Sequence, residues 1–375
     1  MSNRWVKVVS FLTVLALGFF RLAAALSGQS TQSAQPAQQA QNESAPKTAE
    51  QVYKNIQVLK GTPADQLTTT MTFITASLGV NCEFCHVTPY EKDDKKTKQT
   101  ARQMMQMQMA INKENFEGRT QVTCNTCHQG RHEPVAIPVI AEEEPKPEKP
   151  EAAPPKPGEL PTADELINKY VQALGGAEAL QKITSRVEKG TISIANGPQL
   201  AIDVFAEAPN RRVSFTHTPK GDNITLFDGT TAWLRGPGGS PNKLDPANSE
   251  AVKLDAEFNF ALHIKQIFNQ VRVARPEKVK DRETNVILAL QQGQPPVRLY
   301  FDKESGLLVR LVRYANTPLG RLPTQIDYGD YRDSGGVKIP YRWTVARPPR
   351  GRFTIQVDQV QQNVPIDDSK FVMQP

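Results

Sequence analysis

The chain has 375 residues, with 45 Lys and Arg against 39 Asp and Glu, and a formal net charge of +6. At about 100–200 residues per domain, this length suits two domains. Hydrophobic residues make up 38% and aromatic residues 7%, which is low for one compact body and predicts linkers or tails. The positive charge is spread along the chain and forms no dense Lys/Arg block, so the composition does not favour nucleic-acid binding.

Residues 1–26 have the pattern of an export signal. Two basic residues, Arg4 and Lys7, precede an apolar run over residues 8–20, and three consecutive alanines then offer a cleavage site. Arg21 interrupts the apolar stretch, so a cleaved signal is favoured over a membrane anchor, which stays open as the alternative. The sequence therefore predicts a periplasmic protein, either released or anchored to the inner membrane.

Two segments of biased composition divide the rest of the chain. Residues 27–48 are rich in Ser, Gln, Ala and Pro, which predicts a disordered tether. Residues 139–161 carry a Pro/Glu/Lys repeat, which cannot form a core and favours an extended polyproline II spacer. The predicted domains are therefore residues 49–138 and residues 162–375.

The first predicted domain, residues 49–138, has helical patterns. Thr62 followed by Pro63 is a typical helix start, and the apolar residues after it recur at helical spacing until Gly79, a helix-ending glycine. A second, methionine-rich helix is predicted over residues 97–112. No strand pattern is convincing here, so this domain is expected to be mostly α-helical.

The second predicted domain, residues 162–375, has β-rich patterns. It opens with a capping box of Thr162 and Glu165, which predicts one helix. Short β-prone runs separated by turn residues follow, with one helical interruption over residues 249–268. The whole chain is therefore predicted to be an α+β multidomain protein, with a helical module followed by an antiparallel β-sheet and a few helices.

All four cysteines lie in two copies of C-x-x-C-H, NCEFCH at residues 81–86 and TCNTCH at residues 123–128. This is the pattern of c-type haem attachment, in which two thiols form thioethers to the haem and the following His binds the iron. The sequence therefore predicts two haem c groups, with iron, as cofactors. The covalent attachment residues would be Cys82, Cys85, Cys124 and Cys127, and the proximal iron ligands would be His86 and His128.

Three other interpretations of the cysteines were weighed against haem. A disulfide framework in an exported protein is not spaced as two C-x-x-C pairs that are both followed at once by His. A thioredoxin-like redox pair belongs in a βαβ unit, whereas these surroundings are helical. A zinc site explains the cysteines but leaves both histidines as coincidence, and it is the main alternative.

The sixth iron ligand is less clear from the residues alone. His132 is the spare histidine of the first domain, and methionine is a ligand that suits an electron carrier. A methionine-rich helix can equally serve for packing against a core. The candidate methionines of this domain are Met71, Met104, Met105, Met107 and Met109.

Two stretches resemble the photosynthetic reaction centre cytochrome c subunit, a tetrahaem family: Met71 through SLGVNCEFCH, and ARQMMQMQMAIN through VTCNTCHQG. The resemblance covers about residues 50–132 and half of the family's haem motifs. It implies that Met71, at the family's spacing before Cys82, ligates the first haem iron. It implies that Met104, after an Ala-Arg-Gln triplet, ligates the second, with Met107 as the fallback.

The second domain more weakly resembles periplasmic lipoprotein-carrier proteins, through patterns such as FDGTTAWL and YGDYRDSGGVKIPYRWT. These proteins have a curved antiparallel sheet closed by helices around an apolar cavity. The resemblance therefore implies a curved sheet, and it makes a hydrophobic ligand an expectation for residues 162–375. The turn aspartates in these patterns are expected for backbone reasons, and no catalytic residue is predicted.

Together these observations predict an exported dihaem c-type cytochrome that transfers electrons through two covalently attached, His/Met-ligated haems and is fused to a β-rich binding domain. The expected partners are redox proteins, membrane-bound ones included. An electron carrier without substrate chemistry is favoured over an enzyme. The alternatives are a peroxidase-like dihaem enzyme and a redox-sensing carrier of a hydrophobic ligand.

Overall fold

The computed structural model describes residues 47–134 and 160–374, except positions 196 and 350. We call residues 47–134 the N-terminal module and residues 160–374 the β domain. The signal segment and most of the tether and linker predicted from the sequence lie outside the described residues. Within the described ranges, no helix is long and apolar enough to cross a membrane.

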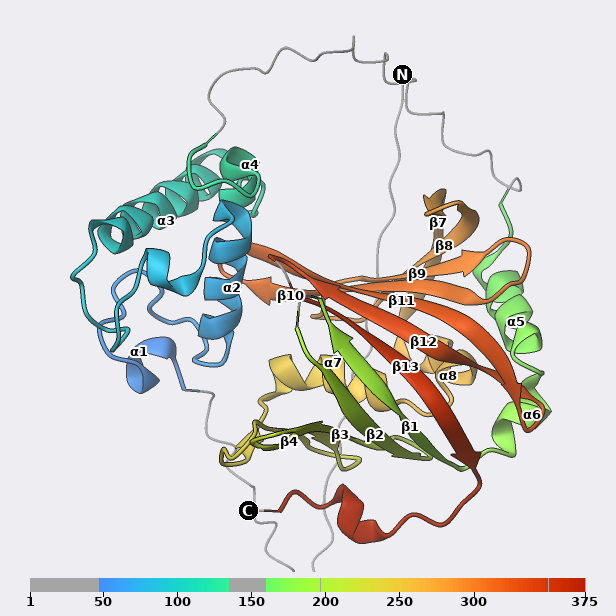
Figure 1. Ribbon diagram of the computed structural model, residues 1–375. Coiled ribbons are helices and arrows are strands. Elements are labelled where there is room, and N and C mark those ends of the chain that lie inside the picture. The colour runs from blue at the N-terminus through green and yellow to red at the C-terminus, as the bar shows by residue number, and fades with distance from the viewer. Residues whose placement is uncertain (1–46, 135–159, 196, 350, 375) are drawn as a thin grey trace, which may run out of the picture. The chain divides into compact units, whose positions relative to one another are not determined.

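The N-terminal module is helical, as the sequence predicts (Figure 1). Its elements are α1 (Ala49–Val52), α2 (Gln66–Leu78), the 3-10 turn η1 (Cys82–Phe84), α3 (Lys96–Asn115) and α4 (Cys124–His128). The expected start of α2 at Thr62 is wrong, because Pro63 forms a β-bridge with Thr48 and Asp65 is the N-cap. Gly79 ends α2 with a φ of 67°, as predicted.

Helices from both C-x-x-C-H segments share one hydrophobic core. Phe73 and Ile74 of α2 and Met105 of α3 are buried in it. Met71 and Cys124 pack against the same cluster, although they come from different segments. The two motifs are therefore carried by a single small core.

The β domain holds the other helices, which are α5 (Ala163–Ala173), α6 (Ala177–Gln181), α7 (Pro246–Ala256), α8 (Phe260–Ile267) and the 3-10 turn η2 (Asp368–Phe371). The predicted capping box is present, since the Glu165 amide donates to Thr162 Oγ1 at 3.2 Å and the Thr162 amide donates to Glu165 Oε2 at 2.7 Å. The single helix expected over residues 249–268 is two helices, because Glu257 adopts an extended conformation between them.

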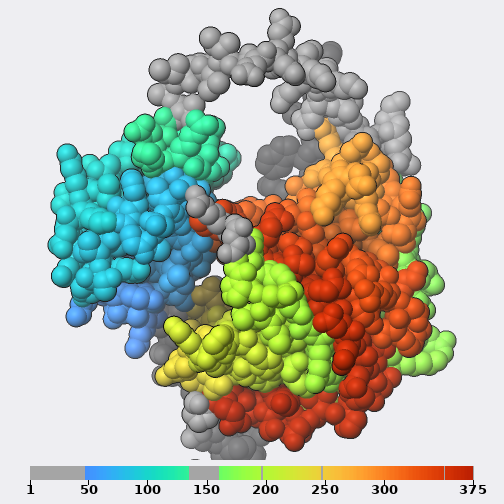
Figure 2. All heavy atoms as spheres, viewed as in Figure 1, coloured from blue at the N-terminus to red at the C-terminus, as the bar shows by residue number. Residues whose placement is uncertain are grey.

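The sheet has thirteen strands among the described residues, in the order β6-β5-β4-β3-β2-β1-β13-β12-β11-β10-β9-β8-β7. The strands are β1 (Ser185–Ile194), β2 (Gln199–Glu207), β3 (Arg211–Thr218), β4 (Gly221–Phe227), β5 (Ala232–Arg235), β6 (Asn242–Lys243), β7 (Gln270–Val279), β8 (Arg282–Leu290), β9 (Val297–Asp302), β10 (Leu308–Thr317), β11 (Gly320–Ser334), β12 (Val337–Arg347) and β13 (Gly351–Gln362). Neighbours in this order are consecutive in the chain except β1 and β13, which pair antiparallel and lie side by side in Figure 2.

The sheet curves around α7 and α8, as Figure 1 shows, and its main core lies on the face that the helices cover. Tyr170 of α5 and Ile264 of α8 pack there with Leu299 and Phe301 of β9. This arrangement confirms the predicted α+β class with a curved antiparallel sheet.

Strand β7 was not expected from the sequence. It carries Arg275 and Pro276 in the middle of its span, and its register with β8 shifts between Ala274 and Glu277. A proline is tolerated in a strand at an edge or a bulge, and β7 is both an edge strand and irregular. Because the sequence of β7 is polar and contains a proline, it does not show the pattern of a strand.

Candidate functional site

Each C-x-x-C-H motif forms a single helical turn. In the first, the Cys82 carbonyl accepts from the amides of Cys85 at 3.2 Å and His86 at 2.9 Å. In the second, Cys124 to His128 is the helix α4. Residues at i, i+3 and i+4 lie on one face of such a turn, so each motif presents two thiols and one imidazole to the same side. All four thiols are free.

Both motif histidines are held in the same tautomer. Nδ1 of His86 lies 3.1 Å from the Tyr90 carbonyl oxygen, and Nδ1 of His128 lies 3.0 Å from that of Arg131. Because a carbonyl can only accept, each Nδ1 carries a proton, and in the neutral imidazole the lone pair is then on Nε2. A histidine that binds a metal through Nε2 is usually oriented in this way by a backbone carbonyl or carboxylate.

The loop after His86 is fixed by cations from α3. Lys98 Nζ donates to the carbonyls of Tyr90 at 2.9 Å and Lys92 at 2.6 Å, and it lies 3.0 Å from Asp93 Oδ1. Arg102 Nη1 donates to Asp93 Oδ2 at 2.8 Å. The hydrogen bonds from Arg102 and then Lys98 hold the pKa of the Asp93 carboxyl well below its ordinary value.

The chain before the second motif is fixed by amides from the same helix. Asn112 Oδ1 accepts from the backbone amides of Gln121 at 3.0 Å and Val122 at 2.9 Å. Asn112 Nδ2 donates to the Val122 carbonyl at 2.7 Å, and Gln108 Nε2 donates to the same oxygen at 2.7 Å. One helix, α3, therefore positions a loop at each motif.

Sequence reasoning missed the polar residues that do this work. Lys98, Gln108 and Asn112 are 8%, 4% and 5% exposed, so they are as buried as the apolar core. The i,i+4 spacing of Gln108 and Asn112 on a helix is the signal that could have indicated a common polar face. A search for apolar periodicity does not detect such a polar face.

The candidate methionines differ in exposure. Met71 is partly buried and packs against the module's core. Met104 and Met107 are 40% and 47% exposed and lie one turn apart on α3, so a cofactor can reach their thioethers. Met105 is 7% exposed and belongs to the core, so packing accounts for it.

The segment after the second motif contacts elements of the first. His132 is exposed, and its ring centroid lies 5.8 Å from that of Phe84, inside the first motif. The Gly130 amide donates to the Ser77 carbonyl of α2 at 2.8 Å. A Cβ at Gly79 would collide with the Gly130 carbonyl oxygen, so only glycine permits this approach. The two motif segments are thus joined backbone to backbone.

The thiols do not converge on one centre. Over residues 47–134 and the described part of the β domain, no three His, Cys, Asp or Glu side chains gather as a metal-ion site requires. Burial raises the pKa of the Cys85 and Cys124 thiols.

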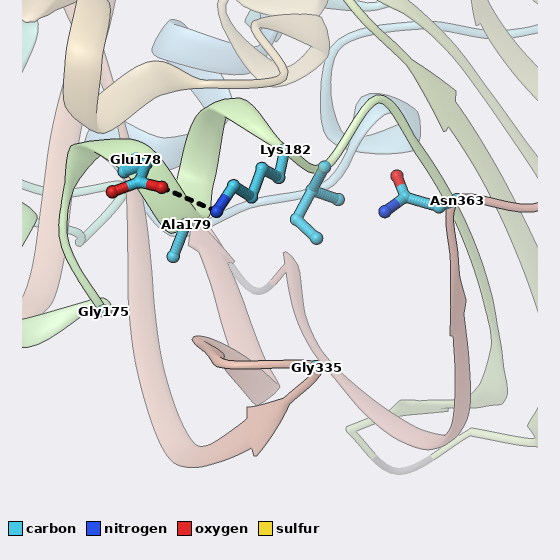
Figure 3. Close-up of a pocket in the computed structure, with 7 residues that line it drawn as sticks. Gly175, Glu178, Ala179, Lys182, Gly335 and Asn363 are labelled. Carbon is cyan, nitrogen blue, oxygen red and sulfur yellow. Dashed lines mark hydrogen bonds and ion pairs between the residues drawn. The ribbon is translucent and has the colours of Figure 1, made fainter.

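Two hollows lie beside α5 and α6 in the β domain. An open groove of about 480 Å³ runs past the ion pair of Glu178 and Lys182, with Asn363 on its other side (Figure 3). An apolar cavity of about 100 Å³ is lined by Tyr170 and Phe258, among other residues. Sites for drug-sized ligands have about 300–1,000 Å³, so the cavity as it stands fits only a small apolar group.

The other histidines and turn aspartates of the β domain have structural partners. His217 lies between Asp222 and Asp203, at 2.8 and 3.3 Å, and His263 Nδ1 lies 2.6 Å from Glu257. Asp228 caps its own turn by accepting from the Thr231 amide at 2.7 Å. These protein contacts explain the positions of the histidines and of Asp228, and no bound ligand is needed to explain them.

The N-terminal module thus has the local geometry of a c-type cytochrome: two attachment turns on one helical core, each with an oriented histidine. The fit to haem c rests on the thiol pairs on one face and on the two imidazoles, each oriented through Nδ1 by a backbone carbonyl. Residues 21–159 match the family model described as photosynthetic reaction centre cytochrome C subunit. This match confirms the resemblance predicted from the two motif segments.

Photosynthetic reaction center cytochrome c subunits of three bacteria are each similar to about a quarter of the chain. Identity is 35% over 107 residues with that of Roseobacter denitrificans, covering 25% of this chain and 29% of the relative. It is 37% over 100 residues with that of Thermochromatium tepidum, covering 25% and 24%. It is 32% over 111 residues with that of Rubrivivax gelatinosus, covering 28% and 30%. The chain thus spans less than a third of each relative's length.

Solved structures resemble the β domain. A LolA superfamily protein from Nitrosomonas europaea has a TM-score of 0.41 and 12% identity, covering 57% of this chain and 99% of that one. A DUF1329 family protein from Desulfovibrio piger has a TM-score of 0.41 and 10% identity, covering 56% and 96%. The predicted likeness to lipoprotein-carrier domains is therefore found, and at these scores it says nothing about a ligand.

Proposed function

We propose that this protein is an exported dihaem c-type cytochrome that carries electrons. The observation that carries the proposal is the repeated geometry of the two C-x-x-C-H turns, each with Nδ1 bonded to a backbone carbonyl. Haem c, when bound, supplies one-electron exchange at a potential that its ligands and surroundings tune. The protein residues hold and orient it, and no substrate bond is made or broken.

Each motif has a defined part in this proposal. Cys82 and Cys85 would anchor the first haem through thioethers, and Cys124 and Cys127 would anchor the second. His86 and His128 offer Nε2 as the proximal ligand, because their Nδ1 protons are engaged with carbonyls.

Methionines complete the proposed ligand sets. Met71 would bind the first haem iron and Met104 the second, with Met107 as the fallback. With a His and a Met holding each iron, the haems would exchange electrons rather than bind small molecules, and methionine would raise the reduction potential. Methionine ligation of both irons therefore distinguishes the proposed electron carrier from the peroxidase-like enzyme.

The site of action is also a proposal. The pattern of residues 1–26 supports export, and c-type haem is attached outside the cytoplasmic membrane, so we place the protein in the periplasm, free or anchored to the inner membrane. Its partners would be redox proteins, membrane-bound ones included. A hydrophobic ligand for the β domain would be sought by lipid extraction of the purified protein.

Haem attachment is tested by intact mass after denaturation. We expect the mature wild-type protein to carry two haems, and Cys82→Ala/Cys85→Ala and Cys124→Ala/Cys127→Ala to carry one each. A wild-type mass without covalent haem, or zinc bound in its place, would overturn the proposal. Two haems in either double variant would overturn the assignment of the attachment residues.

Iron ligation is tested by redox titration with spectra of the wild type, Met71→Ala and Met104→Ala. Loss of a methionine ligand should lower one midpoint potential by on the order of 100 mV and open that iron to carbon monoxide. Met107→Ala tests the fallback assignment, since the Met104 and Met107 side chains are both exposed on one face of α3. If Met107→Ala gives the change and Met104→Ala does not, the fallback is the ligand. Strong carbon monoxide binding by the wild type would favour an enzyme.

A further inference from the structure

The tip of the β10–β11 hairpin is apolar and buried. Thr317 at the end of β10 pairs with Gly320 at the start of β11 across the two-residue turn Pro318-Leu319. Thr317 Oγ1 closes this turn by donating to the Gly320 carbonyl at 2.8 Å and accepting from the Leu319 amide at 3.2 Å. Hairpin tips are usually polar and exposed to solvent, yet Leu319 is 0% exposed.

The N-terminal module is what buries this tip. Leu319 is a member of the module's own hydrophobic core and, among the described residues, is its one buried member from the β domain. The remaining buried members of that core are Ala49, Leu59, Leu67, Phe73, Ile74 and Met105. Gly320 lies against the Phe73 ring so closely that a Cβ there would be 2.5 Å from Cζ. The hairpin tip therefore fills a place in the core of the other domain.

A polar contact joins the same two parts of the chain at a second point. Asn248 of α7 donates through Nδ2 to Asp65 Oδ2 at 2.8 Å. Asp65 is the N-cap of α2, the helix that carries Phe73, and Asn248 lies in the first turn of α7. The two contacts therefore both involve α2: Asn248 binds Asp65 at its start, and Gly320 packs against Phe73 in its middle.

We propose that the β domain is a built-in docking partner of the N-terminal module, with Pro318-Leu319-Gly320 as a plug that seats against Phe73 and with Asn248 and Asp65 as a second contact. The plug fits this module specifically, because Leu319 completes its apolar core and Gly320 has no side chain to collide with the Phe73 ring. The occupant is the chain's own hairpin, since residues 46–375 form one compact unit.

The docking places the β domain on the helix that bears a proposed haem ligand. Met71 precedes Phe73 by two residues on α2, and both pack in the cluster that holds Leu319, so a movement of the plug would reach the Met71 segment through a packed side chain. A change in the β domain would thereby act on the first haem. This consequence rests on the proposed function, whereas the docking itself does not depend on haem.

The test uses the full-length mature protein with a specific protease site introduced between residues 145 and 155. After cleavage, gel filtration at micromolar concentration follows each polypeptide by mass, so the result does not depend on haem. We expect the two wild-type fragments to elute together and those of Leu319→Asp to separate, with at least a tenfold loss of association. Ile194→Asp is the control, because Ile194 is 42% exposed at the end of β1.

Two further variants guard against a folding defect in Leu319→Asp. Gly320→Ala adds one methyl group toward Phe73, and Phe73→Ser removes the ring from the other side; both should weaken association while β-domain unfolding stays unchanged. Separation of the wild-type fragments, or co-elution of all three variants, overturns the proposal. A wild-type dimer that Leu319→Asp converts to monomer would assign the plug to a second copy and overturn it as well.

Discussion

Nδ1 of His86 and Nζ of Lys98 meet at one backbone oxygen, the Tyr90 carbonyl, at 3.1 and 2.9 Å. A carbonyl that also accepts from a cation is a weaker acceptor for the imidazole N–H. The imidazole then gives less electron density to a metal on Nε2, and the ammonium itself disfavours additional positive charge nearby. Both effects act in the same direction on a haem bound by His86.

We therefore expect Lys98→Met to lower the midpoint potential of the first haem by on the order of tens of millivolts. The measurement is a spectroscopic redox titration of the mature protein. Lys96→Met is the matched control, because Lys96 is exposed at the start of the same helix. Equal shifts in both variants would indicate a general charge effect and contradict the role of the shared carbonyl.

Asn112→Ala should loosen the chain before the second motif. The residue is 5% exposed, and its removal leaves the Val122 backbone amide without its acceptor, whereas the Gln121 amide also donates to the Arg119 carbonyl at 2.9 Å. An unpaired buried polar group costs about 1–3 kcal/mol, so we expect a loss of about 1–3 kcal/mol in the unfolding free energy of the module. Denaturant unfolding measures it.

Asn115→Ala is the control for this change, since Asn115 is exposed at the end of α3 and donates only locally, to the Ile111 carbonyl at 3.2 Å. It should stay within about 0.5 kcal/mol of the wild type. Intact mass should also show reduced occupancy of the second haem in Asn112→Ala alone. If the two variants unfold alike, the buried network does not fix this loop.

Gly79→Ala should separate the two motif segments. Alanine at a φ of 67° costs about 1 kcal/mol, and its Cβ would collide with the Gly130 carbonyl. We expect a total loss of about 2–4 kcal/mol in unfolding free energy. Gly118→Ala isolates the collision, because Gly118 has a φ of 76° and open space around it. A loss no greater than that of Gly118→Ala would show that the close approach is dispensable.

The sequence predicted the local elements well and their interplay poorly. The C-x-x-C-H turns, the Gly79 cap and the Thr162 capping box follow from short-range chemistry that a few neighbouring residues determine. Lys98 and Leu319 could not be assigned in this way. Lys98 is polar yet buried because it donates to the carbonyls of Tyr90 and Lys92, in the loop before its helix, which apolar periodicity does not reveal. Leu319 occupies a turn, and only the tertiary structure supplies the core that buries it.

The docking of the β domain should weaken as pH rises. Burial, together with the nearby Asp245 carboxyl, raises the pKa of Asp65 from 3.8 to about 7. A raised folded-state pKa stabilises the docked form fully below the ordinary value of Asp and loses that contribution as pH rises through 7. The groups that face Asp65 from α7 are the Asp245 carboxyl, which repels its charged form, and the Asn248 amide, which donates to it.

We therefore expect the cleaved wild-type protein to associate more tightly at pH 5.5 than at pH 8. Asp65→Asn removes the titrating group and the like-charge repulsion while an amide oxygen can still accept from Asn248, so its association should be nearly independent of pH. Gel filtration of the cleaved protein across this range measures both. Asp94→Asn, an exposed carboxyl of the same module, is the control. Tighter association at pH 8, or an unchanged pH dependence in Asp65→Asn, would show that this carboxyl does not govern the contact.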